Sequence, residues 1–153
     1  MVSLGLLVLR VIIGGIMVAH GYPKVFGGPG KSAAVSPEAE RILGGGFKQA
    51  MDQGGVDNVT GFMQHLGLPY PKPMAMGLMA TELVGGIALI LGWFTRPAAL
   101  ALTVSQLVAI QKVHAPQGLV NSGEAGSGYE FNAALIAGTA ALALAGPGAL
   151  AAD

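Results

Sequence analysis

The chain has 153 residues, of which 52% are hydrophobic and only 10% are charged, with eight basic and eight acidic side chains. A soluble domain usually carries roughly 25% charged residues, so this composition favours lipid as the main solvent. The balanced charge leaves no basic face for nucleic acid. The absence of cysteine excludes thiol redox chemistry and disulfides within this chain.

Four apolar segments are close to the ~20 residues that a membrane crossing requires. Backbone polar groups in hydrocarbon must be bonded within their own segment, so each segment is expected to be a helix. The sequence therefore predicts an all-α integral membrane protein with one domain over residues 1–153. Its predicted form is a bundle of four transmembrane helices, at residues 3–21, 74–92, 97–114 and 129–144.

The first connection, residues 22–73, is too long for a structureless loop in a compact domain. Ser36 followed by Pro37 and an acidic turn predicts the capped start of a short helix. A second short helix is expected over residues 57–66, with Asp57 as its cap and Gly67 as its stop. The glycines at 44–46 are expected to be flexible joints between the two.

The second apolar segment carries one carboxylate, Glu82, in its interior. An ionisable group at such a depth costs ~2.5 to 3.5 kcal/mol and usually has a partner or a task. At ~1.5 Å of rise per residue, Arg10 of the first segment and Gln106 of the third lie at comparable depths. We expect an ion pair between Arg10 and Glu82, whose role is either structural or functional.

Polar groups also gather where the predicted helices meet the larger loops. His20 and Lys24 lie at the end of the first helix, His114 at the end of the third, and Tyr129 with Glu130 at the start of the fourth. Each residue alone suits a helix end without any function. The presence of all these residues at the same end of the predicted bundle favours a binding site there. No pair of ligands shares a helix at metal spacing, so no metal site is expected.

The chain resembles the DoxX family of small four-helix membrane proteins nearly throughout its length. The resemblance is carried by these stretches: LLVLRVIIGGIMVAHGYPKVFG, GLPYPKPMAMGLMATELVGGIALILGWFTRPAAL, the histidine of VAIQKVHAPQG, GYE, and the closing GPGAL with Asp153. The family includes the smaller subunit of a thiosulfate:quinone oxidoreductase. The first loop is longer and richer in glycine than is usual in the family.

The resemblance implies a multi-pass subunit of a redox system in the plasma membrane, with a quinone or a similar amphipathic molecule as its only cofactor. His20, Lys24, Gln106, His114 and Tyr129 would bind that molecule. Glu82 and Glu130 would exchange the protons that accompany its reduction. The implied partners are the lipid bilayer and either another protein subunit or further copies of this chain.

Two other functions stay open at this point. The first is a scaffold subunit without catalysis, which an exposed apolar face on the helix at 57–66 would favour. The second is a small-molecule transporter. This function is less favoured, because the sequence shows no broken helix or inverted repeat of the kind that marks a binding site at the membrane midplane. The distribution of lysine and arginine does not fix the membrane orientation.

Overall fold

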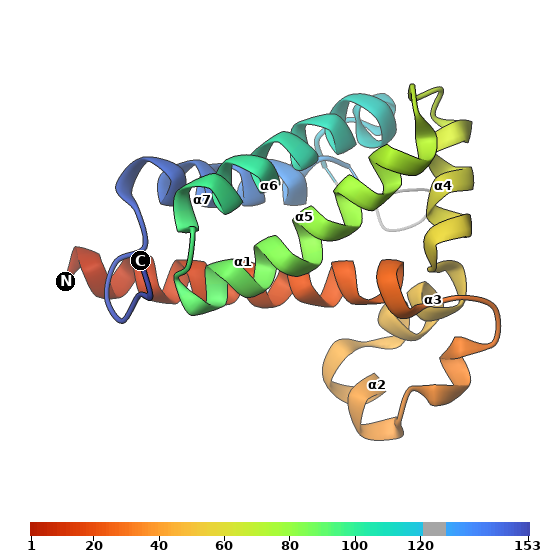
Figure 1. The fold of residues 1–153 in the computed structure, drawn as a ribbon, viewed down its shortest axis with the longest axis horizontal. Helices are drawn as coiled ribbons and strands as arrows, with labels where there is room; N and C mark the ends of the chain where they lie inside the picture. The colour runs from red at the N-terminus through yellow and green to blue at the C-terminus, as the bar shows by residue number, and fades with distance from the viewer. Residues whose placement is uncertain (121–127) are drawn as a thin grey trace. The chain divides into compact units, whose positions relative to one another are not determined.

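The computed structural model describes residues 1–120 and 128–153. Within these residues the chain forms seven α-helices, short 3₁₀ and π segments and no strand. The helices are α1 (Val2–Phe26), α2 (Pro37–Leu43), α3 (Gly45–Gln53), α4 (Val56–His65), α5 (Pro71–Leu91), α6 (Thr95–Ala109) and α7 (Glu130–Ala145) (Figure 1). Their contacts define two compact units: a terminal unit, Met1–Gly15 with Gly85–Asp153, and a central unit, Ile16–Val84.

Three helical segments are long and apolar enough to cross a membrane. They are α1, α5 and the continuous segment Thr95–Gln117, which contains α6, a π-helix (Ile110–His114) and a short 3₁₀ turn. The helix α7 is apolar but shorter, with 16 residues. The expected all-helical, multi-pass membrane architecture is confirmed at this level.

The first helix continues to Phe26, whereas the sequence predicted its end at residue 21. The extension includes Pro23, which is tolerated because only one N–H is lost, in the last turn. The Pro23 carbonyl accepts the N–H groups of Gly27 and Gly55, and the Lys24 carbonyl also accepts the latter. These bonds satisfy carbonyls that a helix end otherwise leaves without partners.

The loop helices are confirmed in part. Ser36 caps α2 as expected, since its Oγ accepts the N–H of Ala39 at 3.1 Å. The next expected helix is α4, which starts after Gly55 rather than at an Asp57 cap. The expectation of flexible joints at 44–46 was wrong: Gly44 turns with φ of 86° and α3 begins at Gly45.

Close helix contacts in the terminal unit depend on small residues, as is typical of membrane helices. A Cβ on Gly14 of α1 would lie 2.6 Å from the carbonyl oxygen of Gly86 in α5. The helices α6 and α7 run alongside each other (Figure 1) and are joined by polar side chains. Thr103 and Thr139 share a hydrogen bond of 2.7 Å, and Asn132 Nδ2 donates to Gln106 Oε1 at 2.8 Å.

Arg10 joins three parts of the terminal unit and is only 1% exposed. Its guanidinium donates to the carbonyls of Leu89 and Ile90 in the last turn of α5. It also donates to three carbonyls of the segment that follows α7, which belong to Pro147, Ala149 and Leu150. This segment returns to the start of α1, where the Ala149 N–H donates to the Ser3 carbonyl (Figure 1).

Asp153, which lies far from α6 in the sequence, caps the start of that helix. Its carboxylate accepts the N–H groups of Phe94 and Thr95, at 2.5 and 3.0 Å. Hydrogen bonding, chiefly from the Thr95 N–H, therefore lowers the pKa of Asp153 below its ordinary value. Phe94 has no side chain suited to capping, so this distant carboxylate takes that role.

This cap predicts a pH-dependent contribution to stability. Because the folded pKa of Asp153 is depressed, its contribution is present above the unfolded pKa, about 3.9, and is lost as pH falls through the folded value. We expect Asp153→Ala to lower the thermal unfolding midpoint at pH 7. The difference between parent and variant should vanish as the pH falls below about 4. A difference that stays constant from pH 7 to pH 3 would contradict the cap.

The central unit has its own small apolar core. Val59 and Met63 of α4 are buried against Ala75 and Met79 of α5. The helices α2 and α3 are linked by an ion pair between Glu40 Oε2 and Lys48 Nζ at 2.9 Å. The long first connection is thus a folded part of the central unit, and its helices bring side chains to the end of α1.

Candidate functional site

A cavity of about 620 Å³ lies in the central unit, at the end of α1. Four helices and the last turn of a fifth contribute to its wall: α1, α3, α4 and α5, with Leu43 of α2. Cavities of about 300–1,000 Å³ are typical of small-molecule sites. The cavity is open to the surroundings, because the polar side chains of His20, Gln53 and Asn58 on its wall remain exposed.

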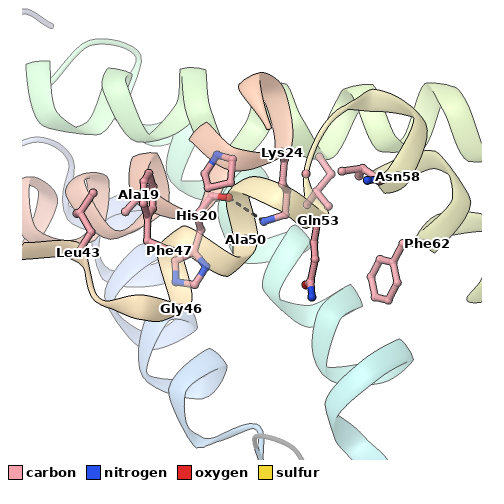
Figure 2. Close-up of a pocket in the computed structure, with 14 residues that line it drawn as sticks. Ala19, His20, Lys24, Leu43, Gly46, Phe47, Ala50, Gln53, Asn58 and Phe62 are labelled. Carbon is pink, nitrogen blue, oxygen red and sulfur yellow. Dashed lines mark hydrogen bonds between the residues drawn. The ribbon is translucent and has the colours of Figure 1, made fainter. Parts of the chain in front are cut away.

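The wall is mostly apolar, with a few polar groups. Phe47 of α3 and Phe62 of α4 are its aromatic members, and Leu78 comes from α5. Figure 2 shows the polar ends of Lys24 and Gln53 and the ring of Phe62 spread around the space. A wide apolar wall with a few hydrogen-bonding groups is typical of sites for amphipathic or ring-shaped ligands.

Lys24 connects this cavity to the buried carboxylate of the second apolar helix. Its ammonium forms an ion pair with Glu82 Oε2. It also donates to the His20 carbonyl at 3.1 Å, which is the dashed line in Figure 2. Glu82 is only 6% exposed and is not part of the cavity wall. Lys24 is therefore the one formally cationic group among the described residues of the wall, and its charge is already balanced.

The expected ion pair between Arg10 and Glu82 must be corrected. All five N–H groups of Arg10 are directed to main-chain carbonyls, and the carboxylate of Glu82 is paired with Lys24 instead. Depth along the helices placed the two groups at comparable levels but gave no information on which faces meet. A lysine one turn beyond the predicted helix end reaches Glu82 because α1 continues through Pro23.

The structure brings together three of the predicted site residues: His20, Lys24 and Glu82. Four others belong to the terminal unit. Gln106 is buried in its hydrogen bond with Asn132, His114 ends the π-helix, and Tyr129 and Glu130 open α7. The backbone N–H groups of Tyr129 and Glu130 donate to Gly118 and Leu119. The assignment of these four residues to ligand binding or proton exchange stays a prediction.

The sequence reasoning missed the contribution of the first connection to the cavity. Phe47, Gln53, Asn58 and Phe62 all line it, and none of them was assigned to a site. A signal for α3 was present, because Phe47, Ala50 and Met51 recur at the spacing of one helix face. The preceding glycine run concealed it, since glycine usually indicates a break in a helix.

Comparisons with known proteins give one positive finding. No curated protein and no solved structure was found to match the chain. The sequence model of the DoxX family matches residues 5–115, from the second turn of α1 to just past the end of the π-helix. That match covers more than half of the chain and both membrane-length helices, α1 and α5, that contribute to the cavity. The chain is therefore a membrane protein that belongs to the DoxX family.

Proposed function

We propose that the central unit binds a quinone or a similar uncharged amphipathic molecule in the cavity at the end of α1, as a subunit of a membrane redox system. The observation that carries this proposal is the cavity itself. It combines a suitable volume and an apolar wall with hydrogen-bonding groups, at the end of a helix long enough to span a bilayer.

We also propose that the chain crosses the membrane four times, with α7, about 24 Å long, as the fourth crossing.

The residues on the wall fit a quinone-type head group. The Phe47 and Phe62 rings and Leu78 provide surfaces for a flat ring and an aliphatic tail. His20, Gln53 and Asn58 provide hydrogen bonds for ring oxygens. A quinone bound there would accept two electrons and two protons. In this proposal a partner subunit supplies the electrons, since this chain has no cysteine for a thiol donor or an iron–sulfur cluster.

Proton supply in this proposal rests on groups that already touch one another. His20 and Lys24 lie on the wall, and Lys24 is paired with Glu82 behind it. A proton that Lys24 donates toward the cavity is replaced by one taken up at Glu82 and passed along the ion pair. Carboxylate and basic side chains linked in this way form proton relays in other membrane proteins.

The scaffold alternative would be favoured by an exposed apolar face on the helix predicted at residues 57–66, which corresponds to α4. In the structure, Val59 and Met63 of that helix are buried against α5, and Phe62 lines the cavity. Val59 and Met63 thus serve the interior of the central unit, whereas Phe62 is partly exposed at the cavity.

A matched pair of histidine variants tests the proposed site. We expect the purified protein in a neutral detergent to bind decyl-ubiquinone saturably, and His20→Ala to weaken this binding about tenfold, because one hydrogen bond in a partly desolvated site contributes roughly 1–2 kcal/mol. His65→Ala is the control, since His65 is exposed on α4 and does not line the cavity. Equal affinities for both variants, or no binding by the folded parent, would contradict the site.

A further inference from the structure

We infer that Glu82 determines the charge selectivity of the cavity: by neutralising Lys24, it makes the site accept uncharged amphipathic ligands and reject anionic ones. This inference deepens the proposed function and rests on it. It assigns to Glu82 the role of a positioning residue, since its carboxylate acts on the ligand only through Lys24.

The first step concerns the position of the two side chains. Lys24 belongs to the cavity wall, and about a quarter of its side chain is exposed. The Glu82 side chain is 8% exposed and lies outside the wall. A ligand in the cavity therefore meets the cation directly and the anion only behind it.

The second step concerns the charge that remains. Asn58 and Gln53 are uncharged, and no described residue of the wall carries an acidic group. His20 is the other titratable residue of the wall, and imidazole side chains are ordinarily uncharged at pH 7.5. The ion pair leaves the wall with no net charge. An anionic ligand would have to leave water without gaining a free cation, which is unfavourable.

The third step concerns what happens when the carboxylate is removed. Glu82→Gln preserves the size of the side chain and can still accept a hydrogen bond from the Lys24 ammonium. The positive charge of Lys24 then becomes available to the cavity. A unit charge within a few ångström of a ligand in a partly buried site is a substantial interaction. The same pocket should then select anions.

The experiment compares two ligands that share a ring and differ by one permanent charge. They are 1,4-naphthoquinone and 1,4-naphthoquinone-2-sulfonate, titrated against the purified full chain in neutral detergent at pH 7.5. The chain has no cysteine, so thiol addition to the quinone ring does not interfere. The measured quantity is the ratio of the two dissociation constants, which cancels differences in overall stability between variants.

We expect the parent to bind the uncharged ring at least tenfold more tightly than the sulfonate. Glu82→Gln should shift this ratio at least tenfold toward the sulfonate. The double variant Lys24→Gln with Glu82→Gln should restore the parent ratio, because both charges are then absent. The double variant also replaces the ion pair with two neutral amides of similar size. If Glu82→Gln alone fails to fold, a double-variant ratio shifted toward the sulfonate would still overturn the inference.

The possible outcomes separate the inference from the function on which it rests. If the parent binds the uncharged ring and neither variant behaves as expected, the role of Glu82 is overturned and the cavity remains a binding site. The inference is also overturned if the ratio of dissociation constants shifts equally toward the sulfonate in Glu82→Gln and in the double variant, because the charge of Lys24 would then not cause the shift. If the folded parent binds neither ligand, the proposed function falls as well.

Discussion

Replacement of Arg10 with methionine is expected to destabilise the protein by at least about 3 kcal/mol. The arginine is 1% exposed and donates five hydrogen bonds to main-chain carbonyls of α5 and of the segment after α7. Each hydrogen bond of a charged group contributes roughly 1.5–3 kcal/mol, although such contributions do not add in full. Methionine fills similar space but leaves all five carbonyls without this partner.

Two further variants identify the cause of that loss. Arg10→Lys keeps the positive charge but has three donors on one nitrogen, so it is expected to recover only part of the stability. Arg96→Met removes an exposed arginine from the same unit and should change the unfolding midpoint little. The measurement is thermal unfolding in one detergent, with proteolysis of residues 146–153 as a local readout. A full rescue by lysine would show that charge alone matters.

Gly54→Ala is expected to be the most damaging small substitution in the central unit. A Cβ at this position would overlap the carbonyl oxygen of Pro23 and lie 2.6 Å from its carbonyl carbon. Both atoms are main chain, so relief requires movement of the α3–α4 connection away from the end of α1. We expect a loss of about 1–3 kcal/mol. Because Gly54 and Pro23 both line the cavity, quinone binding should be lost too.

The control for this prediction is another glycine of the same unit. Gly61 lies within α4, and a Cβ there would meet no heavy atom within 4 Å. Gly61→Ala should leave stability unchanged or raise it by up to about 1 kcal/mol, since alanine favours the helix. If both variants unfold at the same temperature, the close contact between Gly54 and Pro23 does not contribute to stability.

The sequence was sufficient to predict the features that depend on local composition and on local motifs. The length and hydropathy of α1 and α5 follow directly from their residues, and the start of α2 follows from Ser36 and Pro37. These features are local, because each depends on a few neighbouring residues. The predicted end of α1 was wrong because Gly21 and Pro23 both indicate a stop, whereas bonds from Gly55, distant in sequence, satisfy carbonyls of the extended helix.

The partners of the buried charges could not be predicted in the same way. Arg10 bonds with carbonyls, which every residue has, so no pattern of side chains indicates where they lie. Asp153 caps α6 across more than fifty residues of chain, and this pairing has no local signal either. Glu82 was correctly expected to need a partner, but the choice between Arg10 and Lys24 depends on the rotation of α1, which depth alone does not give.

The central claim is that the cavity at the end of α1 binds a quinone-type ligand, and photolabelling tests it most directly. A quinone analogue that carries a photoreactive azide would be crosslinked to the purified full chain, and the labelled peptides would be identified by mass spectrometry. We predict labels on residues 19–24, 43–54 or 58–62, and competition by unlabelled decyl-ubiquinone. Labels confined to α6 and α7, or labels that excess decyl-ubiquinone does not reduce, would contradict the claim.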